Sequence, residues 1–333
     1  MKIFHNPANH GLPDLPADYR STVLSVGNYD GVHLGHRFLL ARVVQRARAL
    51  GARSVAVTFE PHPTHLLRPG AGPRLITPNL RERLELLATT GIDAAVVLPF
   101  TAEFSQQSAE AFAQNVLLER LHAVEVHEGD NFRFGFRAQA GVDELSALGA
   151  RLGFTVHIYK ALRVRGMDVS SSRIRQLISA GDMRRARWLL GRPFSISSTP
   201  ARGRGIGSRL TVPTINLADY DGVVPADGVY ITRMQVAAST SDAGNPDELC
   251  FDSVSNVGTR PTFADASFAI ESHLLDFRPT ALSVTLDETT PLRLTFLARL
   301  RDEQQWPSPE ALREQIGRDV AAARRYLRRL ARP

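Results

Sequence analysis

The stretch Val26-Gly27-Asn28-Tyr29-Asp30-Gly31-Val32-His33-Leu34-Gly35-His36 decides the fold of the first part of this chain. An apolar run precedes it at residues 23–26, and a helical pattern of apolar residues follows it to residue 50. A strand that passes through a glycine loop into a helix N-terminus is a site suited to anionic phosphate. Two imidazoles three residues apart at this turn can both hydrogen-bond one phosphoryl group and stabilise the charge that develops on it.

The glycine spacing of this stretch does not match a Walker loop, which ends in Lys-Ser/Thr. We therefore expect attack on an α-phosphate, with transfer of a nucleotidyl group and release of pyrophosphate. His33 and His36 are the expected catalytic residues. The remaining residues of the loop that we assign to ATP and phosphate binding are Gly27, Asn28, Asp30 and Gly35.

Length and composition predict a two-domain intracellular protein. The chain has 333 residues, of which 43% are hydrophobic, so it can build two ordinary cores. It has no run of about 18 apolar residues, and residues 1–7 lack a charged-then-apolar export signal. Cys250 is the one cysteine, which excludes an intrachain disulfide and a cysteine-rich zinc site. We expect a cytoplasmic location and no membrane partner.

The charge of the chain favours small anionic substrates. The formal net charge is +6 and the isoelectric point is near 9.9. Lys2 and Lys160 are the only lysines, so arginine carries nearly all of the basicity. The arginine-rich segments 184–187 and 324–329 fall in helical patterns, where a solvated face is expected. A basic RNA-binding protein is the disfavoured alternative, and a homo-oligomer is left open.

The first half of the chain alternates short β-branched runs with longer helical patterns. The expected strands are residues 23–26, 54–59, 94–98, 124–128 and 156–159, and the expected helices are residues 37–50, 79–89, 109–122 and 143–152. This rhythm predicts a Rossmann-like parallel sheet with helices on its faces and ligands at the carboxyl ends of the strands. The two-histidine loop follows the first of these strands.

The alternation of strand and helix patterns stops at Gly191-Arg192-Pro193. This sequence ends a pair of short helices at residues 172–179 and 183–190. Alternating segments follow at residues 194–198, 229–236, 249–254, 268–275 and 292–300. Ser308 then caps a final helix that has Pro309 at its first position. We expect an antiparallel β-barrel closed by a C-terminal helix, and two domains over residues 1–191 and 192–333.

Two further segments of the first domain end predicted strands at the same edge as the histidines. In the segment 58–63, Glu60 and His62 could contact substrate, although a simple strand-end turn is the favoured interpretation of His62 taken alone. In the segment 129–135, Asn131 and Arg133 supply hydrogen-bond and charge donors. Phe132 either stacks on a planar ring or packs in the core, and both interpretations stay open.

The sequence Ser170-Ser171-Ser172-Arg173 opens a helix. Its hydroxyls, its free backbone N–H groups and the positive helix end predict a second phosphate cradle. An ordinary serine N-cap is the alternative for this segment taken alone. Together with the two-histidine loop, this segment is expected to bind one triphosphate from two sides.

The second domain offers a separate set of candidates. Gly205 and Gly207 belong to a flexible Gly/Arg loop, which we assign to ATP binding. Thr214 and Asn216 lie two residues apart, so in an extended chain they face the same side and could ligate Mg²⁺ through oxygen. Glu271 could deprotonate a hydroxyl that attacks a γ-phosphate, although a lone strand glutamate is more often solvated.

Together these segments resemble the prokaryotic bifunctional riboflavin kinase/FMN adenylyltransferases, also called FAD synthetases. The segments 33–36, 58–63, 129–135 and 170–175 resemble the adenylyltransferase module, and the segments 189–194, 213–216, 256–263 and 271–277 resemble the kinase module. The resemblance implies that riboflavin takes the γ-phosphate of ATP in the barrel. It also implies that the FMN formed attacks the α-phosphate of a second ATP in the first domain, giving FAD and pyrophosphate.

The resemblance also implies roles for the residues singled out above. His33 and His36 stabilise the adenylyl transition state, and Ser171, Ser172 and Arg173 hold phosphates. Thr214 and Asn216 bind Mg-ATP, and Glu271 is the base on the riboflavin 5′-hydroxyl. The expected flavin-binding residues are Asn131, Phe132, Arg133, Glu60 and His62.

The kinase module departs from the family pattern in two places. Where the family usually has Gly-Arg-x-Leu-Gly-Phe, this chain has Gly207-Ser208-Arg209-Leu210-Thr211-Val212. Ser208 removes a cation and Thr211 removes a permissive glycine. Residues 278–282 replace the usual Leu-Tyr-Gly segment. The alternative to a bifunctional enzyme is therefore a monofunctional FMN adenylyltransferase whose barrel binds flavin without phosphorylating it.

Overall fold

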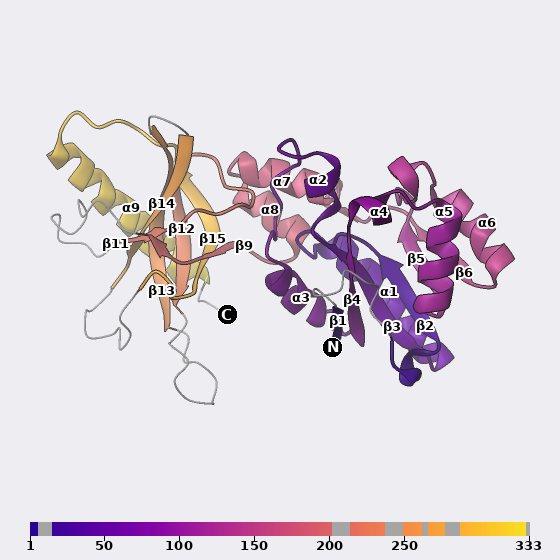
Figure 1. Cartoon of the computed structure of the whole chain (residues 1–333). Helices are drawn as coiled ribbons and strands as arrows, with labels where there is room; N and C mark the ends of the chain where they lie inside the picture. Colours follow the sequence, from indigo (N-terminus) through magenta and orange to yellow (C-terminus); the bar gives the residue numbers. More distant parts are fainter. Residues whose placement is uncertain (6–14, 202–213, 237–248, 262–265, 277–286, 331–333) are drawn as a thin grey trace. The chain divides into compact units, whose positions relative to one another are not determined.

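The computed structural model describes residues 1–5, 15–201, 214–236, 249–261, 266–276 and 287–330. The chain divides into two compact units, Met1–Arg173 and Ile174–Pro333 (Figure 1). The first unit holds an α/β sheet and the second an antiparallel β-sheet with a long C-terminal helix.

The first unit is built on a six-stranded sheet in the order β1-β4-β3-β2-β5-β6, and every pair in it is parallel. Its strands are β1 (Lys2–His5), β2 (Thr22–Val26), β3 (Arg53–Glu60), β4 (Ala94–Pro99), β5 (Ala123–Gly129) and β6 (Thr155–Tyr159). The chain winds from β2 to β4 on one side and returns to β5 and β6 on the other. The topological switch point therefore lies between β2 and β5, where ligands bind in open α/β sheets.

Helices cover both faces of this sheet. They are α1 (Leu34–Leu50), α2 (Pro63–Leu67), α3 (Leu80–Ala88), α4 (Ala102–Ser105), α5 (Ala109–Ala111), a π-helix (Phe112–Arg120) and α6 (Val142–Leu152). A short antiparallel pair, β7 (Arg163–Val164) and β8 (Met167–Asp168), precedes α7 (Ser171–Ser179).

Alternation along the strands explains why two layers of helix are needed. On β3, Val55 and Val57 join a core with the π-helix and α6, whereas Ala56 joins a second core with Leu40 of α1 and Leu84 of α3. Successive side chains of a strand point to opposite faces, so both faces of β3 are apolar and both are covered. The predicted Rossmann-like parallel sheet is confirmed.

The second unit contains a seven-stranded antiparallel sheet in the order β10-β11-β14-β13-β12-β15-β9. Its elements are α8 (Met183–Leu190), β9 (Phe194–Ser198), β10 (Pro200–Ala201), β11 (Thr214–Leu217), β12 (Gly228–Val236), β13 (Leu249–Pro261), β14 (Ala266–Leu274), β15 (Leu292–Arg301) and α9 (Pro309–Leu330). Only Thr199 separates β9 from β10, yet these two strands lie at opposite ends of the order. The sheet must therefore curl so that its two edge strands approach each other, as a half-barrel.

The C-terminal helix packs on one face of this half-barrel. Ala323 and Leu327 of α9 are buried against Val229 and Ile231 of β12 and Leu297 of β15. Ser308 caps the helix, because its Oγ accepts a hydrogen bond from the N–H of Ala311 at 3.2 Å. The expected antiparallel barrel with a C-terminal helix is confirmed in this form.

Five strands and the short helices α2 and α4 were not anticipated by the sequence patterns, and one expected helix differs in type. The strands β1, β7, β8, β10 and β11 have only two to four residues each, too few to show a period. The expected helix at residues 109–122 is α5 continued by a π-helix, whose wider turn places Phe112, Val116 and Leu117 in the core.

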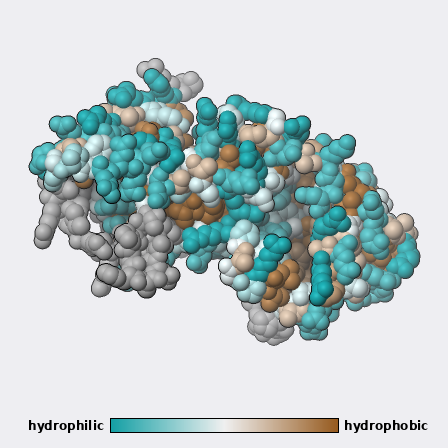
Figure 2. All heavy atoms as spheres, turned by 90° about the horizontal axis from the view of Figure 1, so that it is seen from above, coloured by the Kyte–Doolittle hydropathy of each residue, from teal (hydrophilic) through white to brown (hydrophobic). Residues whose placement is uncertain are grey.

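The surface is consistent with the composition. The face in Figure 2 is mostly hydrophilic, with hydrophobic residues in several small groups. Among the described residues, no helix is both long enough and apolar enough to cross a membrane.

Candidate active sites

A cavity of about 800 Å³ opens in the first unit at the carboxyl ends of β2 and β5. It lies where the order of the parallel strands reverses, as expected for this topology. The predicted site residues that line it are Gly27, Asn28, His33, Gly35, His36, Asn131, Phe132, Arg133, Ser170, Ser171 and Ser172. Three segments that are distant in sequence therefore meet at one cavity.

The two histidines lie against each other at the start of α1. Their rings are stacked, with centroids 3.6 Å apart and planes 14° apart. His33 is the N-cap, and its Nδ1 accepts a hydrogen bond from the backbone N–H of His36 at 3.3 Å. A Cβ at position 35 would lie 3.2 Å from the His33 ring, so Gly35 leaves room for this arrangement. Both imidazoles are thus held at a helix N-terminus, which favours an anion.

His36 is kept neutral. Burial, with a smaller effect of the neighbouring His33, lowers the pKa of His36 well below its usual value of 6.5. The ring packs edge-on against Tyr29 at a centroid distance of 5.3 Å. Its Nδ1 is buried and has no hydrogen-bond partner among the described residues. A neutral imidazole in this position can donate one hydrogen bond to a ligand that enters the cavity.

Asp30 holds the loop rather than lining the cavity. It is 2% exposed, and its Oδ1 accepts hydrogen bonds from the backbone N–H groups of Ile76 at 2.8 Å and Thr77 at 3.0 Å. Its backbone carbonyl accepts a hydrogen bond from the Ser171 hydroxyl at 3.0 Å. This last contact ties the two-histidine loop to the start of α7.

The serine-rich segment begins α7 beside that contact. The Oγ of Ser170 accepts a hydrogen bond from the backbone N–H of Arg173 at 3.2 Å, as an N-cap does. Ser170, Ser171 and Ser172 line the cavity, whereas Arg173 is not among its lining residues. The N-cap and the cradle are therefore compatible, because the helix end that the serine caps faces the cavity.

The segment after β5 forms a tight turn at the cavity wall. The N–H of Phe132 donates to the carbonyl of Gly129 at 3.0 Å, and a Cβ on Gly129 would lie 3.1 Å from Oδ1 of Asn131. Phe132 stacks on the buried Phe134 with ring centroids 5.5 Å apart. Phe132 therefore packs on the core and lines the cavity at the same time.

Glu60 and His62 lie outside the cavity lining. Oε2 of Glu60 accepts a hydrogen bond from the fully buried Arg83 at 2.9 Å. His62 is 6% exposed and caps α2, with Nδ1 accepting from the N–H of Thr64 at 3.2 Å. Both side chains are engaged in holding the strand-end loop, which agrees with the turn interpretation of His62.

Glu128 is a cavity residue that the sequence patterns missed. It is 2% exposed, and its Oε1 accepts a hydrogen bond from the backbone N–H of Val26 at 2.6 Å. Burial raises the pKa of Glu128 well above its usual value of 4.5. Its one sequence signal is its place one position before the Gly-Asp-Asn segment, since its burial cannot be seen in the sequence.

The half-barrel gathers the kinase candidates on one face. Asn216 of β11 pairs with Glu271 of β14, and Thr214 pairs with His273. Residues opposite each other in an antiparallel ladder share a face, so these four half-buried side chains form one polar row. The flanking Ile215 is buried on the other face. Gly205, Gly207, Ser208, Thr211 and residues 278–282 lie outside the described residues.

Comparison with known proteins identifies the family of this chain. Residues 15–173 match the family model described as FAD synthetase, and residues 190–327 match the one described as riboflavin kinase. The bifunctional riboflavin kinase/FMN adenylyltransferase of Pseudomonas fluorescens is 34% identical over 94% of this chain and 96% of its own length. The chain belongs to the bifunctional riboflavin kinase/FMN adenylyltransferase family.

A second relative supports the same family. The Escherichia coli K12 protein of the same description is 31% identical over 95% of this chain and 96% of its own length. A solved structure titled as a macrolide-efflux protein from Streptococcus pneumoniae has a TM-score of 0.78 at 24% identity, covering 93% of this chain and 98% of that one. At that identity it shows the fold alone. Because both family models match, the monofunctional alternative is not favoured.

Proposed function

We propose that this riboflavin kinase/FMN adenylyltransferase divides its two activities between its two halves. FMN adenylylation takes place in the cavity of the first unit, and riboflavin phosphorylation takes place on the polar row of the half-barrel. The observation that carries the first assignment is that the stacked histidines, the start of α7 and Asn131 line one cavity. We place the domain boundary after Gly191, which ends α8 in a left-handed conformation, so residues 1–191 and 192–333 are the two domains.

In the adenylylation site, a phosphate oxygen of FMN attacks the α-phosphorus of ATP. The bond from that phosphorus to the bridging oxygen breaks, and the electron pair leaves with pyrophosphate. Negative charge develops on the non-bridging oxygens of the α-phosphate. His33 and His36 at the N-terminus of α1 stabilise that charge through hydrogen bonds and the positive helix end, without forming a covalent bond.

The serine-rich end of α7 is the second half of the triphosphate cradle. Ser172 offers a hydroxyl, and Ser171 and Ser172 offer backbone N–H groups, at a helix N-terminus that faces the cavity. The hydrogen bond from Ser171 to the carbonyl of Asp30 keeps this cradle in register with the two-histidine loop. Gly27, Asn28 and Gly35 line the cavity between them, whereas Asp30 and Arg173 support it from outside the lining.

The flavin is held by the turn after β5. Asn131 supplies an amide, Arg133 a cation and Phe132 a ring face at the cavity wall. Glu60 and His62 act on this site only through the loop they hold, because their polar atoms bond Arg83 and Thr64. This changes their expected role from flavin contact to positioning.

Mg²⁺ fits the residues of the half-barrel. The Thr214 hydroxyl, the Asn216 amide oxygen and the Glu271 carboxylate are all oxygen donors on one face of paired strands, and Mg²⁺ prefers oxygen ligands. Thr214 and Asn216 would hold the ion with ATP. When bound, Mg²⁺ neutralises charge on the transferred phosphoryl group.

Glu271 is the base of the kinase reaction in this proposal. Its register pairs it with Asn216 on one side and with Asn256 of β13 on the other. Its carboxylate takes the proton of the riboflavin 5′-hydroxyl as that oxygen attacks the γ-phosphorus of ATP, and ADP leaves. The substrates are ATP, riboflavin and FMN, and no nucleic-acid partner is part of the proposal. The single cysteine fits a cytoplasmic location.

Product analysis tests this proposal. Purified protein is incubated with ATP and Mg²⁺ and either riboflavin or FMN, and the flavins are separated by chromatography. We expect FMN and FAD from riboflavin, and FAD from FMN. FAD from FMN alone would refute the assignment of the half-barrel. No flavin product in either reaction would refute both assignments.

A further inference from the structure

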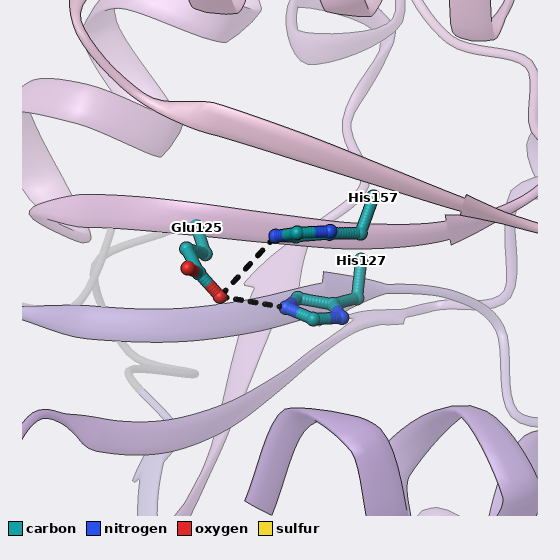
Figure 3. A group of neighbouring side chains, drawn as sticks. All are labelled: Glu125, His127 and His157. Atoms are coloured by element: carbon teal, nitrogen blue, oxygen red, sulfur yellow. Dashed lines mark hydrogen bonds and ion pairs between the residues drawn. The ribbon is translucent and has the colours of Figure 1, made fainter. Parts of the chain in front are cut away.

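A second cluster of chemically active side chains lies on the sheet face that α1 covers. Glu125 and His127 are two residues apart on β5, and His157 is paired with His127 on β6 (Figure 3). One ligand atom from each of the three lies within 4.8 Å of the other two. None of the three lines the cavity of the first unit. The proposed function leaves this cluster without a role.

The geometry of the cluster suits a tetrahedral metal ion. Nε2 of His127 lies 3.2 Å from Oε2 of Glu125, and Nε2 of His157 lies 3.5 Å from the same oxygen. Tetrahedral ligands at 2.0–2.1 Å from a zinc ion are about 3.3 Å from each other. The two imidazole rings are stacked, with centroids 4.6 Å apart, so both point the same nitrogen at the carboxylate (Figure 3).

The surroundings of the histidines are those of metal ligands. Nδ1 of His127 lies 2.9 Å from the Tyr159 hydroxyl, a contact that orients the ring and leaves Nε2 toward Glu125. His127 is fully buried, so its ring is fixed in this orientation. Nε2 of His157 is buried and makes no hydrogen bond among the described residues, although it lies at ion-pair distance from Glu125.

Arg46 of α1 competes for the same carboxylate. Its guanidinium donates to both oxygens of Glu125, and these hydrogen bonds lower the pKa of Glu125 to about 2. The Arg46 side chain is 41% exposed, so it can turn out to solvent. The His157 side chain is 36% exposed on β6, the edge strand of the sheet. An ion therefore has a path to the cluster from the edge.

We propose that Glu125, His127 and His157 form a binding site for a divalent first-row transition metal, with Zn²⁺ as its best-suited ion. Nε2 of each histidine and a carboxylate oxygen of Glu125 are the protein ligands, and they leave the fourth tetrahedral position to a ligand from outside the protein. Two imidazoles and one carboxylate are a donor set that zinc sites use, whereas Mg²⁺ prefers oxygen alone. The site goes beyond the proposed function and does not depend on it.

Titration calorimetry of the full chain with ZnCl₂, without nucleotide, tests the proposal. We expect one tight site in the wild-type protein. His157→Gln removes a half-exposed ligand on an edge strand and should weaken that site by more than about 100-fold, since even outer-shell changes cost 10- to 100-fold. His5→Gln is the matched control: an exposed histidine on the other edge strand, which should leave the affinity unchanged.

Arg46→Gln gives the opposite result if the proposal is correct. It frees the Glu125 carboxylate from its competing cation and should tighten Zn²⁺ binding roughly three- to tenfold. Co²⁺ added to the same protein should give the visible absorption of a tetrahedral site, and His157→Gln should abolish it. The control variant His36→Gln separates this site from the stacked histidines of the cavity.

Three outcomes would overturn the proposal. The first is the absence of a tight site in both wild-type protein and Arg46→Gln. The second is binding that His157→Gln leaves intact. The third is binding that only His36→Gln removes, which would place the ion in the cavity. If His157→Gln does not fold, the Arg46→Gln titration decides alone, because a purely structural ion pair predicts no gain in Zn²⁺ affinity.

Discussion

Replacing Glu128 with glutamine should stabilise the first unit, and the gain should grow with pH. Burial raises the pKa of Glu128 well above 4.5, so the folded protein keeps a proton that the unfolded chain loses. The stability that this carboxyl contributes is full below about pH 4.5 and is lost as the pH rises toward the folded pKa. Glutamine is neutral at every pH and keeps an Oε1 that accepts from the N–H of Val26.

The size of the effect follows from proton linkage. One proton bound by the folded state alone changes the free energy of unfolding by about 1.4 kcal/mol per pH unit. For a unit of this size, 1 kcal/mol shifts the melting temperature by roughly 2–4 °C. The difference in melting temperature between Glu128→Gln and wild type should therefore widen by roughly 3–6 °C per pH unit above pH 4.5. It levels off once the pH exceeds the folded pKa.

Scanning calorimetry at pH 5, 6, 7 and 8 measures this difference. Trp306 is the one tryptophan of residues 192–333, so in a Trp188→Phe background the tryptophan fluorescence follows the second domain alone, and the transition that it does not follow belongs to the first. Glu144→Gln, an exposed residue of α6, is the matched control and should track wild type at every pH. The reasoning would be refuted if the melting temperatures of Glu128→Gln and wild type differed by the same amount at every pH, or if their difference became smaller as the pH rises.

Three further variants test the two sites and their supports. His36→Ala should lower the rate of FAD formation from FMN by about 10²- to 10³-fold, as loss of a transition-state hydrogen-bond donor does, and leave FMN formation from riboflavin unchanged. Asp30→Ala should lower the free energy of unfolding of the first unit by roughly 2–4 kcal/mol in urea titrations, because two buried backbone N–H groups lose their acceptor. Asp319→Ala should lower the free energy of unfolding of the second unit by roughly 2–4 kcal/mol, because the largely buried Arg301 loses the carboxylate that pairs with it. Tryptophan fluorescence measures this change.

Each of these variants has a contradicting outcome. An equal loss of both activities in folded His36→Ala would show that the cavity is not specific to adenylylation. Unchanged urea titrations for Asp30→Ala would show that the loop does not depend on its carboxylate. A shift in the first transition for Asp319→Ala, with the second unaltered, would contradict the place of α9 in the half-barrel.

Most of the fold could be predicted because it rests on local patterns. The apolar runs that become β2 to β6 fall between helices in a strict alternation, and this alternation alone implies a parallel sheet covered on both faces. The strand β1 could not be predicted, because Lys2–His5 is mostly exposed and exists as a strand only by pairing with β4, about 90 residues away. The same holds for β11, whose partner β14 lies more than 50 residues further on.

The candidate site was predicted where it depends on chain order and missed where it depends on distant contacts. His33, Asn131 and Ser171 follow strands or open helices, so their place at the sheet edge is set by topology. Asp30 was expected to bind phosphate, but its partners are backbone groups 46 and 47 residues away. The burial of Glu128 likewise depends on the neighbouring strand β2 and is invisible in a single sequence.

Mixing two variants tests the central claim, that two separate sites act in sequence through FMN. His36→Ala and Glu271→Gln are each incubated with riboflavin, ATP and Mg²⁺, first alone and then together, and FAD is measured. We predict at most about 1% of the wild-type rate of FAD formation from either variant alone and a much higher rate from the mixture, because FMN released by the first is adenylylated by the second. A mixture that forms no FAD, from variants that are folded and each retain one activity, would contradict the claim.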